Sequence, residues 1–369
     1  MMKLLSLFSG IGAFEKALKN ANVDYDLVGF SEIDKFAIKS YCAVHGVNEN
    51  LNLGDVSSID IELLPQNIDI IVHGSPCQDY SVAGKGEGGD KGSGTRSSLM
   101  WYSVEIIKHC KPKYVIWENV KNVLSKKHIH NFNQYIEDLK EVGYTSYYKV
   151  LNAKDFGLPQ NRERIYVVSM LDNQHTFEFP QGFPLELKLK DILEDSVEDK
   201  YYLSQEIQNR FKQTRTEGNI IGTTAPEFRT IGQRDLVYNP DGVMGSLVAT
   251  DYKQPKQIIE VLPVRLGGVF DEGGKRHQAG SIYDKEFISP TLDTMQGGWR
   301  QPLIVDGEVV TNFKIRRLTP LECWRLMGFE DDDFYKAKNV PTSDTQLYKQ
   351  IGNSIAVPVL ENIFKNLFK

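Results

Sequence analysis

Short apolar runs alternate with helix-spaced apolar positions through the first 170 residues or so of the chain. Leu4–Phe8 and Ile68–Val72 have the length and composition of buried strands, and apolar positions at helical spacing follow from Ala13 to Leu18. Strands separated by helices predict βαβ units, in which helices cover both faces of a mostly parallel sheet. We expect further strands at 26–30, 114–117 and 164–169 and helices at 34–44 and 131–142.

The pattern changes in the second half, where residues 185–307 are rich in Gly, Thr, Gln and Arg and carry only short extended runs. Helical spacing returns at 319–327 and 355–368. We therefore predict an α/β domain of residues 1–184 and 308–369, interrupted by a smaller, irregular, β-rich domain of residues 185–307. Inside the interruption, segments 237–255 and 282–302 resemble each other, which fits two similar hairpins or a duplicated recognition element.

Composition bounds the class of protein. The 369 residues carry a net charge of −6 and 25% charged residues, which excludes disordered and collagen-like chains. No apolar stretch approaches the roughly 18 residues that span a membrane. The four cysteines form no CxxC pair, so we expect no zinc site and a reducing, cytoplasmic compartment. Residues 201–320 hold 15 basic and 14 acidic residues, so basic contacts to nucleic acid would be local despite the overall acidity.

A glycine-rich turn follows the first predicted strand. Gly10 and Gly12 allow a tight turn and close approach of a ligand to the next helix. Glu32 lies 20 positions beyond Gly12, at the end of the second strand, where α/β nucleotide sites place a carboxylate for ribose hydroxyls. The same glycine spacing also occurs in purely structural turns.

Two further strands end in reactive side chains. Cys77 follows the strand at 68–72 in a Gly-Ser-Pro-Cys-Gln turn, and the glycine-rich segment 82–96 after it suits a loop that closes over a substrate. Cys110 and Cys323 lie in apolar, helical surroundings typical of structural cysteines. Glu118 ends a neighbouring strand, where it fits either a proton donor of raised pKa or a helix cap.

Two arginines precede the last strand of the first half. Alternation places Gln160, Arg162 and Arg164 on one face, which suits planar recognition of a carbonyl or a phosphate. Surface ion pairs with Glu163 are the alternative.

Taken in order, these segments resemble the cytosine-5 DNA methyltransferases of bacteria and phages. The resemblance covers about two-thirds of the chain and omits the 185–307 region, which in that family is the variable target-recognition domain. Ser6 stands where the family often has Asp. The segments that carry the resemblance are 7–12, Gly54-Asp55, 75–78 (Ser-Pro-Cys-Gln), 118–120 (Glu-Asn-Val), 160–164 (Gln-Asn-Arg-Glu-Arg), 316–329 and 352–358.

The resemblance implies an S-adenosylmethionine-dependent methyltransferase fold of Rossmann-like type and a metal-free mechanism. The Cys77 thiolate would add to carbon 6 of a cytosine flipped out of double-stranded DNA, and carbon 5 would then take the methyl group. Glu118 would contact N3 and the exocyclic amine. Arg164, helped by Arg162, would donate to the base carbonyl or hold the catalytic loop.

The resemblance also implies binding residues. Residues expected at S-adenosylmethionine are Phe8 on the adenine, Gly10 and Gly12 near the methionine part, Glu32 at the ribose, Asp55 at the adenine amine, Pro76, Asn353 and Ser354. Residues expected at DNA are Gln78, Ser81 and Arg96. In the 185–307 region, which the resemblance does not cover, the candidates for contacts to base edges are Arg229, Arg234, Arg265, Arg276 and Arg300. The protein is expected to act as a monomer, with a separately acting restriction endonuclease where it belongs to a restriction–modification system.

Three alternatives stand beside this interpretation. An RNA (tRNA) cytosine-5 methyltransferase can share the motif order, but the roughly 145 residues between Ser169 and Ile315 favour a reader of DNA sequence. A non-catalytic DNA-binding protein would not need Cys77, Glu118 and Arg164 together. A nicotinamide dehydrogenase would not need the Pro-Cys turn.

Overall fold

The computed structural model describes residues 1–77, 79–80, 88–171, 175–210, 212–213, 218–261, 265–268, 281–284, 303–305 and 313–369. The contacts divide the chain into two compact units. Unit 1 comprises Met1–Ser196, Asp241–Lys256 and Leu318–Lys369, and unit 2 comprises Val197–Pro240 and Gln257–Arg317. In the part of the chain that the structure describes, no helix has the length and apolar character to cross a membrane.

Unit 1 is built on a six-stranded sheet with the order β2-β1-β3-β4-β7-β5. The first four strands pair in parallel, and β7 runs antiparallel to both β4 and β5. The mostly parallel α/β sheet predicted from the sequence is therefore confirmed. The strands are β1 (Met2–Leu7), β2 (Tyr25–Ser31), β3 (Ile70–His73), β4 (Tyr114–Val120), β5 (Thr145–Asn152) and β7 (Glu163–Met170).

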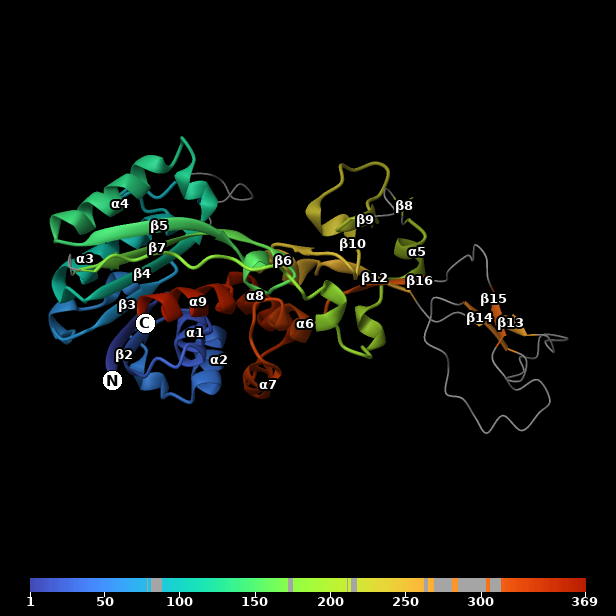
Figure 1. Ribbon diagram of the computed structural model, residues 1–369, viewed down its shortest axis with the longest axis horizontal. Helices are drawn as coiled ribbons and strands as arrows, with labels where there is room; N and C mark the ends of the chain where they lie inside the picture. The colour runs from blue at the N-terminus through green and yellow to red at the C-terminus, as the bar shows by residue number, and fades with distance from the viewer. Residues whose placement is uncertain are drawn as a thin grey trace. The chain divides into compact units, whose positions relative to one another are not determined.

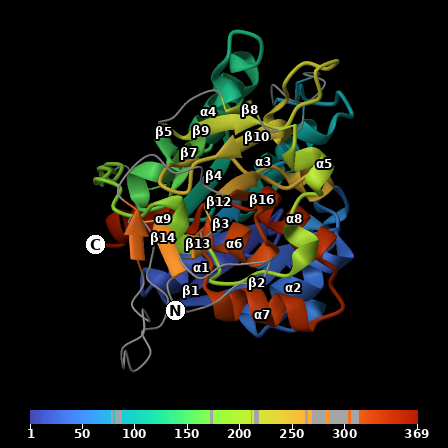
Figure 2. The same ribbon diagram turned by 90° about the vertical axis from the view of Figure 1, so that its right-hand side faces the viewer.

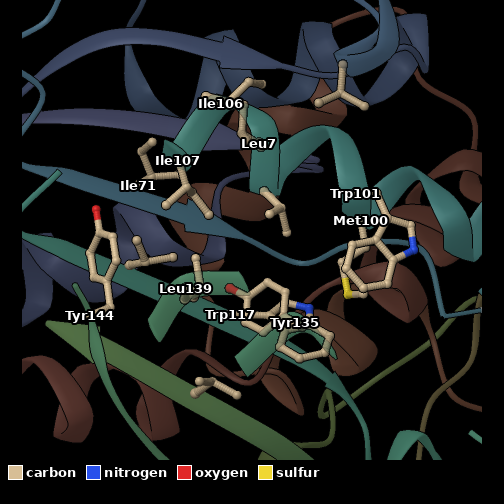
Figure 3. Close-up of a cluster of buried hydrophobic side chains, with 14 of the residues drawn as sticks. Leu7, Ile71, Met100, Trp101, Ile106, Ile107, Trp117, Tyr135, Leu139 and Tyr144 are labelled. Atoms are coloured by element: carbon tan, nitrogen blue, oxygen red, sulfur yellow. The ribbon is translucent and has the colours of Figure 1, made fainter. Parts of the chain in front are cut away.

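Helices cover both faces of this sheet (Figures 1 and 2). One face carries α1 (Ala13–Asn20) and α9 (Val357–Leu367), which pack on each other. The other carries α3 (Met100–Cys110) and α4 (Ile129–Glu141). Figure 3 shows the core beneath these two helices, where Trp117 of β4 lies among the side chains of α3 and α4. The remaining helices of unit 1 are α2 (Lys35–His45), α6 (Pro320–Arg325), α7 (Asp331–Asn339) and α8 (Asp344–Asn353).

The elements predicted from periodicity are all present, with ends shifted by one to a few residues. The sequence did not reveal β5, at the edge of the sheet. Its first six residues are only half-buried or exposed, so it lacks the apolar run that marks a central strand.

Unit 2 contains short strands. One five-stranded sheet has the order β16-β12-β10-β9-β8, and a three-stranded sheet has the order β13-β14-β15. The elements are α5 (Gln205–Gln208), β8 (Lys212–Gln213), β9 (Ile220–Thr223), β10 (Leu236–Tyr238), β12 (Gln257–Val261), β13 (Arg265–Gly268), β14 (Ser281–Asp284), β15 (Leu303–Val305) and β16 (Phe313–Arg317).

The units do not end where the sequence placed the boundaries of the interruption. Residues 185–196 and 241–256 belong to unit 1, and 308–317 belong to unit 2. The reason is pairing in unit 1, where β11 (Met244–Gly245) lies parallel to β6 (Gln160–Asn161). Of the two similar segments, 237–255 is described and contains β10, whereas residues 285–302 of the second lie outside the described residues.

Candidate functional site

The segment that carries Cys77 is held by β4. After β3 ends at His73, the buried Ser75 accepts hydrogen bonds at its Oγ from Trp117 Nε1 at 3.0 Å and Asn119 Nδ2 at 3.1 Å. Asn119 also donates to the Ser75 carbonyl at 3.2 Å. Three bonds from one strand therefore anchor the residue two positions before Cys77.

Glu118 projects from β4 into the same site. Its side chain is almost fully buried, and its Oε1 lies 3.3 Å from Arg164 Nε. A Cβ on Gly74 would stand 3.8 Å from Glu118 Oε2, so the carboxylate lies against the turn after β3. Burial raises the pKa of Glu118, and the charges of Arg164 and Arg162 oppose that rise only in part.

Cys77 is half-buried beside these groups. Burial raises the pKa of its thiol, Arg164 and Arg162 act to lower this pKa, and Glu118 acts to raise it. The fold thus brings the predicted Cys77, Glu118 and Arg164 into one site at the carboxyl ends of β3 and β4. A thiol, a carboxyl of raised pKa and a guanidinium there can perform nucleophilic and acid–base chemistry.

The Arg162 side chain bonds to backbone carbonyls of other segments of unit 1. Its buried guanidinium donates to the carbonyls of Leu247 at 2.7 Å and Ser354 at 2.6 Å and to Ser246 Oγ at 3.3 Å. Burial, followed by the charge of Arg164, lowers the pKa of Arg162 to about 10. Arg162 therefore joins three separate segments of unit 1 behind the site.

A second group of predicted residues gathers at the ends of β1 and β2. Glu32 Oε2 accepts from the Gly10 amide at 2.9 Å, and Oε1 accepts from the amides of Ile33 and Asp34. Asn52 Oδ1 accepts from the amides of Glu32 and Gly54, both at 3.1 Å. Sequence reasoning missed Asn52, whose only signal was its place just before Gly54-Asp55.

The turn after β1 requires glycine at one position for two reasons. Gly12 has φ 81°, and a Cβ there would fall 2.0 Å from His45 Nε2, which itself lies 3.0 Å from the Ile11 carbonyl oxygen. Gly10 also has positive φ, at 56°, but nothing lies within 4 Å of its Cβ position. Phe8 adopts φ 53°, which is uncommon for an aromatic residue.

The other predicted cofactor residues differ in environment. Asp55 is exposed and caps a short 3-10 helix by accepting from the Ser57 amide at 2.9 Å. Asn353 is exposed at the end of α8, whereas Ser354 is buried and its Oγ has no hydrogen-bond partner among the described residues. Lys349 Nζ lies 2.5 Å from Asp34 Oδ2, which holds α8 near the segment that follows Glu32.

The residues predicted at DNA are only partly placed. Arg96 and Arg234 are exposed, and Arg265 lies in β13, where only the backbone is described. Arg229 instead pairs with the buried Asp235 through both terminal nitrogens, at 3.0 and 2.6 Å. Gln78, Ser81, Arg276 and Arg300 lie outside the described residues.

Residues 2–369 match the family described as C-5 cytosine-specific DNA methylase. The chain belongs to this family. It is a DNA cytosine-5 methyltransferase, and its family implies methylation that depends on S-adenosylmethionine. In the described ranges, no group of three or more His, Cys, Asp or Glu residues is placed to hold a metal ion.

Relatives within the family align over nearly the whole chain. "Orphan methyltransferase M.SPRI" of Bacillus phage SPR is 36% identical over 440 residues, covering 99% of this chain and 97% of the relative. "Type II methyltransferase M2.ScrFI" of Lactococcus lactis subsp. cremoris is 34% identical over 420 residues, covering 100% and 99%.

Solved structures share the fold of this methyltransferase at low identity. The S. pombe Dnmt2 methyltransferase superposes with a TM-score of 0.63 at 17% identity, covering 99% of this chain and 97% of that one. A Spodoptera frugiperda DNMT2 mutant superposes with a TM-score of 0.64 at 19% identity, covering 100% of both chains.

Proposed function

We propose that Cys77 forms a covalent bond to carbon 6 of a cytosine flipped out of a specific duplex DNA sequence, so that carbon 5 becomes methylated. The observation that carries this assignment is the shared site of Cys77, buried Glu118 and Arg164 at the ends of β3 and β4. Bases cannot react in this way inside the duplex stack, which is why flipping is required.

The three side chains suit the chemical problem. Carbon 5 of cytosine is a poor nucleophile until addition of a thiolate at carbon 6 breaks the aromaticity of the ring. Burial raises the pKa of the Glu118 carboxyl above its ordinary value. Glu118 can therefore donate a proton to N3 and stabilise the adduct. Arg164 stabilises both the Cys77 thiolate and charge on the base carbonyl. Loss of the carbon-5 proton then expels Cys77.

The residues at the ends of β1 and β2 fit S-adenosylmethionine, which supplies the methyl group when bound. The Gly10 position is open, Glu32 presents a carboxylate with acceptor capacity beyond its amide bonds, and Ser354 carries a buried hydroxyl without a protein partner among the described residues. We assign to this site Phe8, Gly10, Gly12, Glu32, Asp55, Pro76, Asn353 and Ser354. The exposed Ile33 beside Glu32 adds an apolar surface.

Unit 2 would supply target recognition, since it lies outside the α/β unit that carries the site. Its exposed side chains, among them Arg234, would read base edges, while the exposed Arg96 of unit 1 would contact a phosphate. The enzyme would act as a monomer, and a restriction endonuclease, where one accompanies it, would act separately.

The assignment is tested by transfer of label from tritiated S-adenosylmethionine to duplex DNA, followed by bisulfite sequencing of the product. We expect 5-methylcytosine at one sequence, abolished by Cys77→Ser and retained by Cys42→Ser, which changes another half-buried free thiol. Label on adenine, or only on tRNA, would contradict the assignment.

The role of Glu118 has its own test. The Glu118→Gln variant should bind duplex DNA but lose most turnover, because an amide cannot transfer a proton to N3. Full activity of this variant would remove the proposed proton role while leaving that of Cys77 intact.

A further inference from the structure

The segment between β9 and β10 of unit 2 forms a loop (Figure 1). Two apolar side chains of this loop are exposed. Phe228 is 91% exposed and Ile231 is 54% exposed. Single exposed apolar residues are common on protein surfaces. Here, however, the loop that carries the exposed ring is joined to the rest of unit 2 by side-chain hydrogen bonds.

An ion pair closes the tip of this loop. Arg229 donates to Asp235 through both terminal nitrogens, and Asp235 Oδ2 also accepts from the Gly232 amide at 2.7 Å. Asp235 is only 2% exposed, and although burial alone would raise its pKa, Arg229 and the Gly232 amide hold that pKa below its ordinary value. A bidentate pair with a buried carboxylate therefore fixes the residue that directly follows Phe228 to the far end of the loop.

A second clamp holds the base of the loop. The fully buried Gln257 of β12 accepts from Thr224 Oγ1 at 2.9 Å and donates to the Arg234 carbonyl at 2.9 Å. The Thr224 amide also donates to the Asp235 carbonyl at 2.9 Å. One side chain thus joins the two ends of the loop, so exposure of Phe228 is a feature of a fixed conformation.

We propose that this loop, residues 226–235, is a DNA-contacting element in which Phe228 packs against bases of the target duplex and Arg229 serves as its internal brace. The inference rests on the proposed function, because duplex DNA is taken as the substrate. The exposed side chains of the loop include an aromatic ring, an aliphatic group, Gln233 and Arg234, a mixture suited to base stacking and base-edge contacts. The prediction that Arg229 itself contacts DNA is replaced by this bracing role.

The test measures binding of full-length protein to a duplex that the wild type methylates, over a range of salt concentrations. Phe228→Ala should weaken binding about 10- to 100-fold, the effect of losing one well-buried aromatic contact. Because no charge is removed, the slope of log affinity against log salt should not change. Leu63→Ala is the matched control, since Leu63 is 81% exposed in unit 1 and should leave binding unchanged.

A substitution of Arg229 tests whether this residue stabilises the loop or contacts a phosphate. Arg229→Gln should lower duplex affinity with an unchanged salt slope, because Arg229 neutralises Asp235 rather than a phosphate. A reduced slope would show a phosphate contact at Arg229 and overturn the bracing role.

Several outcomes overturn the proposal. They are unchanged duplex affinity in Phe228→Ala, or a changed sedimentation mass, which would show that the loop binds a second protein copy. Methyl transfer by the wild type to plasmid DNA, measured before the duplex is chosen, tests the proposed function separately. Transfer with no effect of Phe228→Ala would refute only the loop, whereas absence of transfer would refute the proposed function itself.

Discussion

The reactivity of Cys77 depends on two opposing neighbours. Arg164 favours its thiolate and Glu118 disfavours it, while burial keeps the pKa of the thiol above its ordinary value. The free enzyme therefore disfavours the Cys77 thiolate, and in the proposed mechanism loss of the thiol proton activates Cys77.

Alkylation of Cys77 by iodoacetamide should rise with pH, with a midpoint above that of an ordinary cysteine. Arg164→Gln should raise this midpoint because it removes a stabilising positive charge, and Glu118→Gln should lower it. A shift of about one pH unit would change the rate at neutral pH about tenfold. Mass spectrometry of the Cys77 peptide measures this rate.

The Cys42 peptide is the internal control. Burial and the charge of Glu49 raise the pKa of Cys42, so changes at Arg164 or Glu118 should leave its alkylation unchanged. Equal shifts at both cysteines would show a general change in the fold and contradict the local explanation.

The glycine-rich turn after β1 allows a second prediction at the same scale. Gly12→Ala should cost both left-handed strain and a clash with His45, about 3 kcal/mol together. The His45 ring cannot move away freely, because it contacts the Ile11 carbonyl and packs 4.8 Å from the Tyr41 ring. Urea unfolding without S-adenosylmethionine measures the cost.

Gly46→Ala is the matched control for this prediction. Gly46 has φ 68° and nothing within 4 Å of its Cβ position, so alanine there should cost only about 1 kcal/mol of strain. Equal costs at positions 12 and 46 would rule out the clash with His45.

At the scale of elements, β4 positions both halves of the proposed catalytic site. The strand presents Glu118 to Arg164, and its neighbours Trp117 and Asn119 hold Ser75. The Trp117 ring lies 4.4 Å from that of Tyr135 in α4, so the packing of α4 on the sheet also supports the Cys77 segment.

Trp117→Phe should keep most of this aromatic packing but remove one of the two donors to Ser75 Oγ. We expect kcat to fall about tenfold, since small misplacements of a nucleophile are costly, with little change in KM for either substrate. Stability should also fall by about 1–2 kcal/mol.

Trp324→Phe distinguishes positioning from general destabilisation. Trp324 is fully buried and donates to the Leu347 carbonyl at 3.3 Å, so its replacement removes a comparable hydrogen bond away from Ser75. We expect a similar loss of stability with kcat preserved. A kcat that falls equally in both variants would argue against a positioning role for Trp117.

At the scale of the whole molecule, the chain passes between the two units several times. Residues 241–256 return to unit 1 between two segments of unit 2. There, Met244 pairs with Gln160, the Leu247 carbonyl accepts from Arg162, and Val248 packs against Gly352 so closely that any Cβ on Gly352 would clash. This segment is therefore part of the catalytic unit.

A chimera tests this division. Replacing 197–240 and 257–317 with the equivalent segments of a relative should preserve S-adenosylmethionine binding and change the methylated sequence. Replacing all of 185–307 should lower the melting temperature, because Arg162 and Gln160 lose matched partners. Calorimetry and bisulfite sequencing of both chimeras provide the measurements. Equal stability of the two chimeras would contradict the assignment of 241–256 to unit 1.

The amino-acid sequence by itself determined the α/β architecture and the set of residues at the ends of β1–β4. These depend on local properties, because apolar periodicity marks a strand or helix and parallel strands bring their carboxyl ends to one edge. Cys77 and Glu118 could therefore be grouped before their contacts were known, whereas Arg164, on the antiparallel strand β7, was grouped with them only through the resemblance to the family.

Only the tertiary structure decided what each charged side chain contacts and where the units divide. Arg162 and Arg164 look alike in the sequence, yet Arg162 is bonded to carbonyls 85 and 192 positions away while Arg164 faces Glu118. Likewise, the sequence marked Arg229 only as a candidate contact to DNA, and the structure shows that its guanidinium pairs with Asp235. A buried ion or a buried carbonyl must find a partner, and that partner is set by packing between distant segments, which periodicity does not encode.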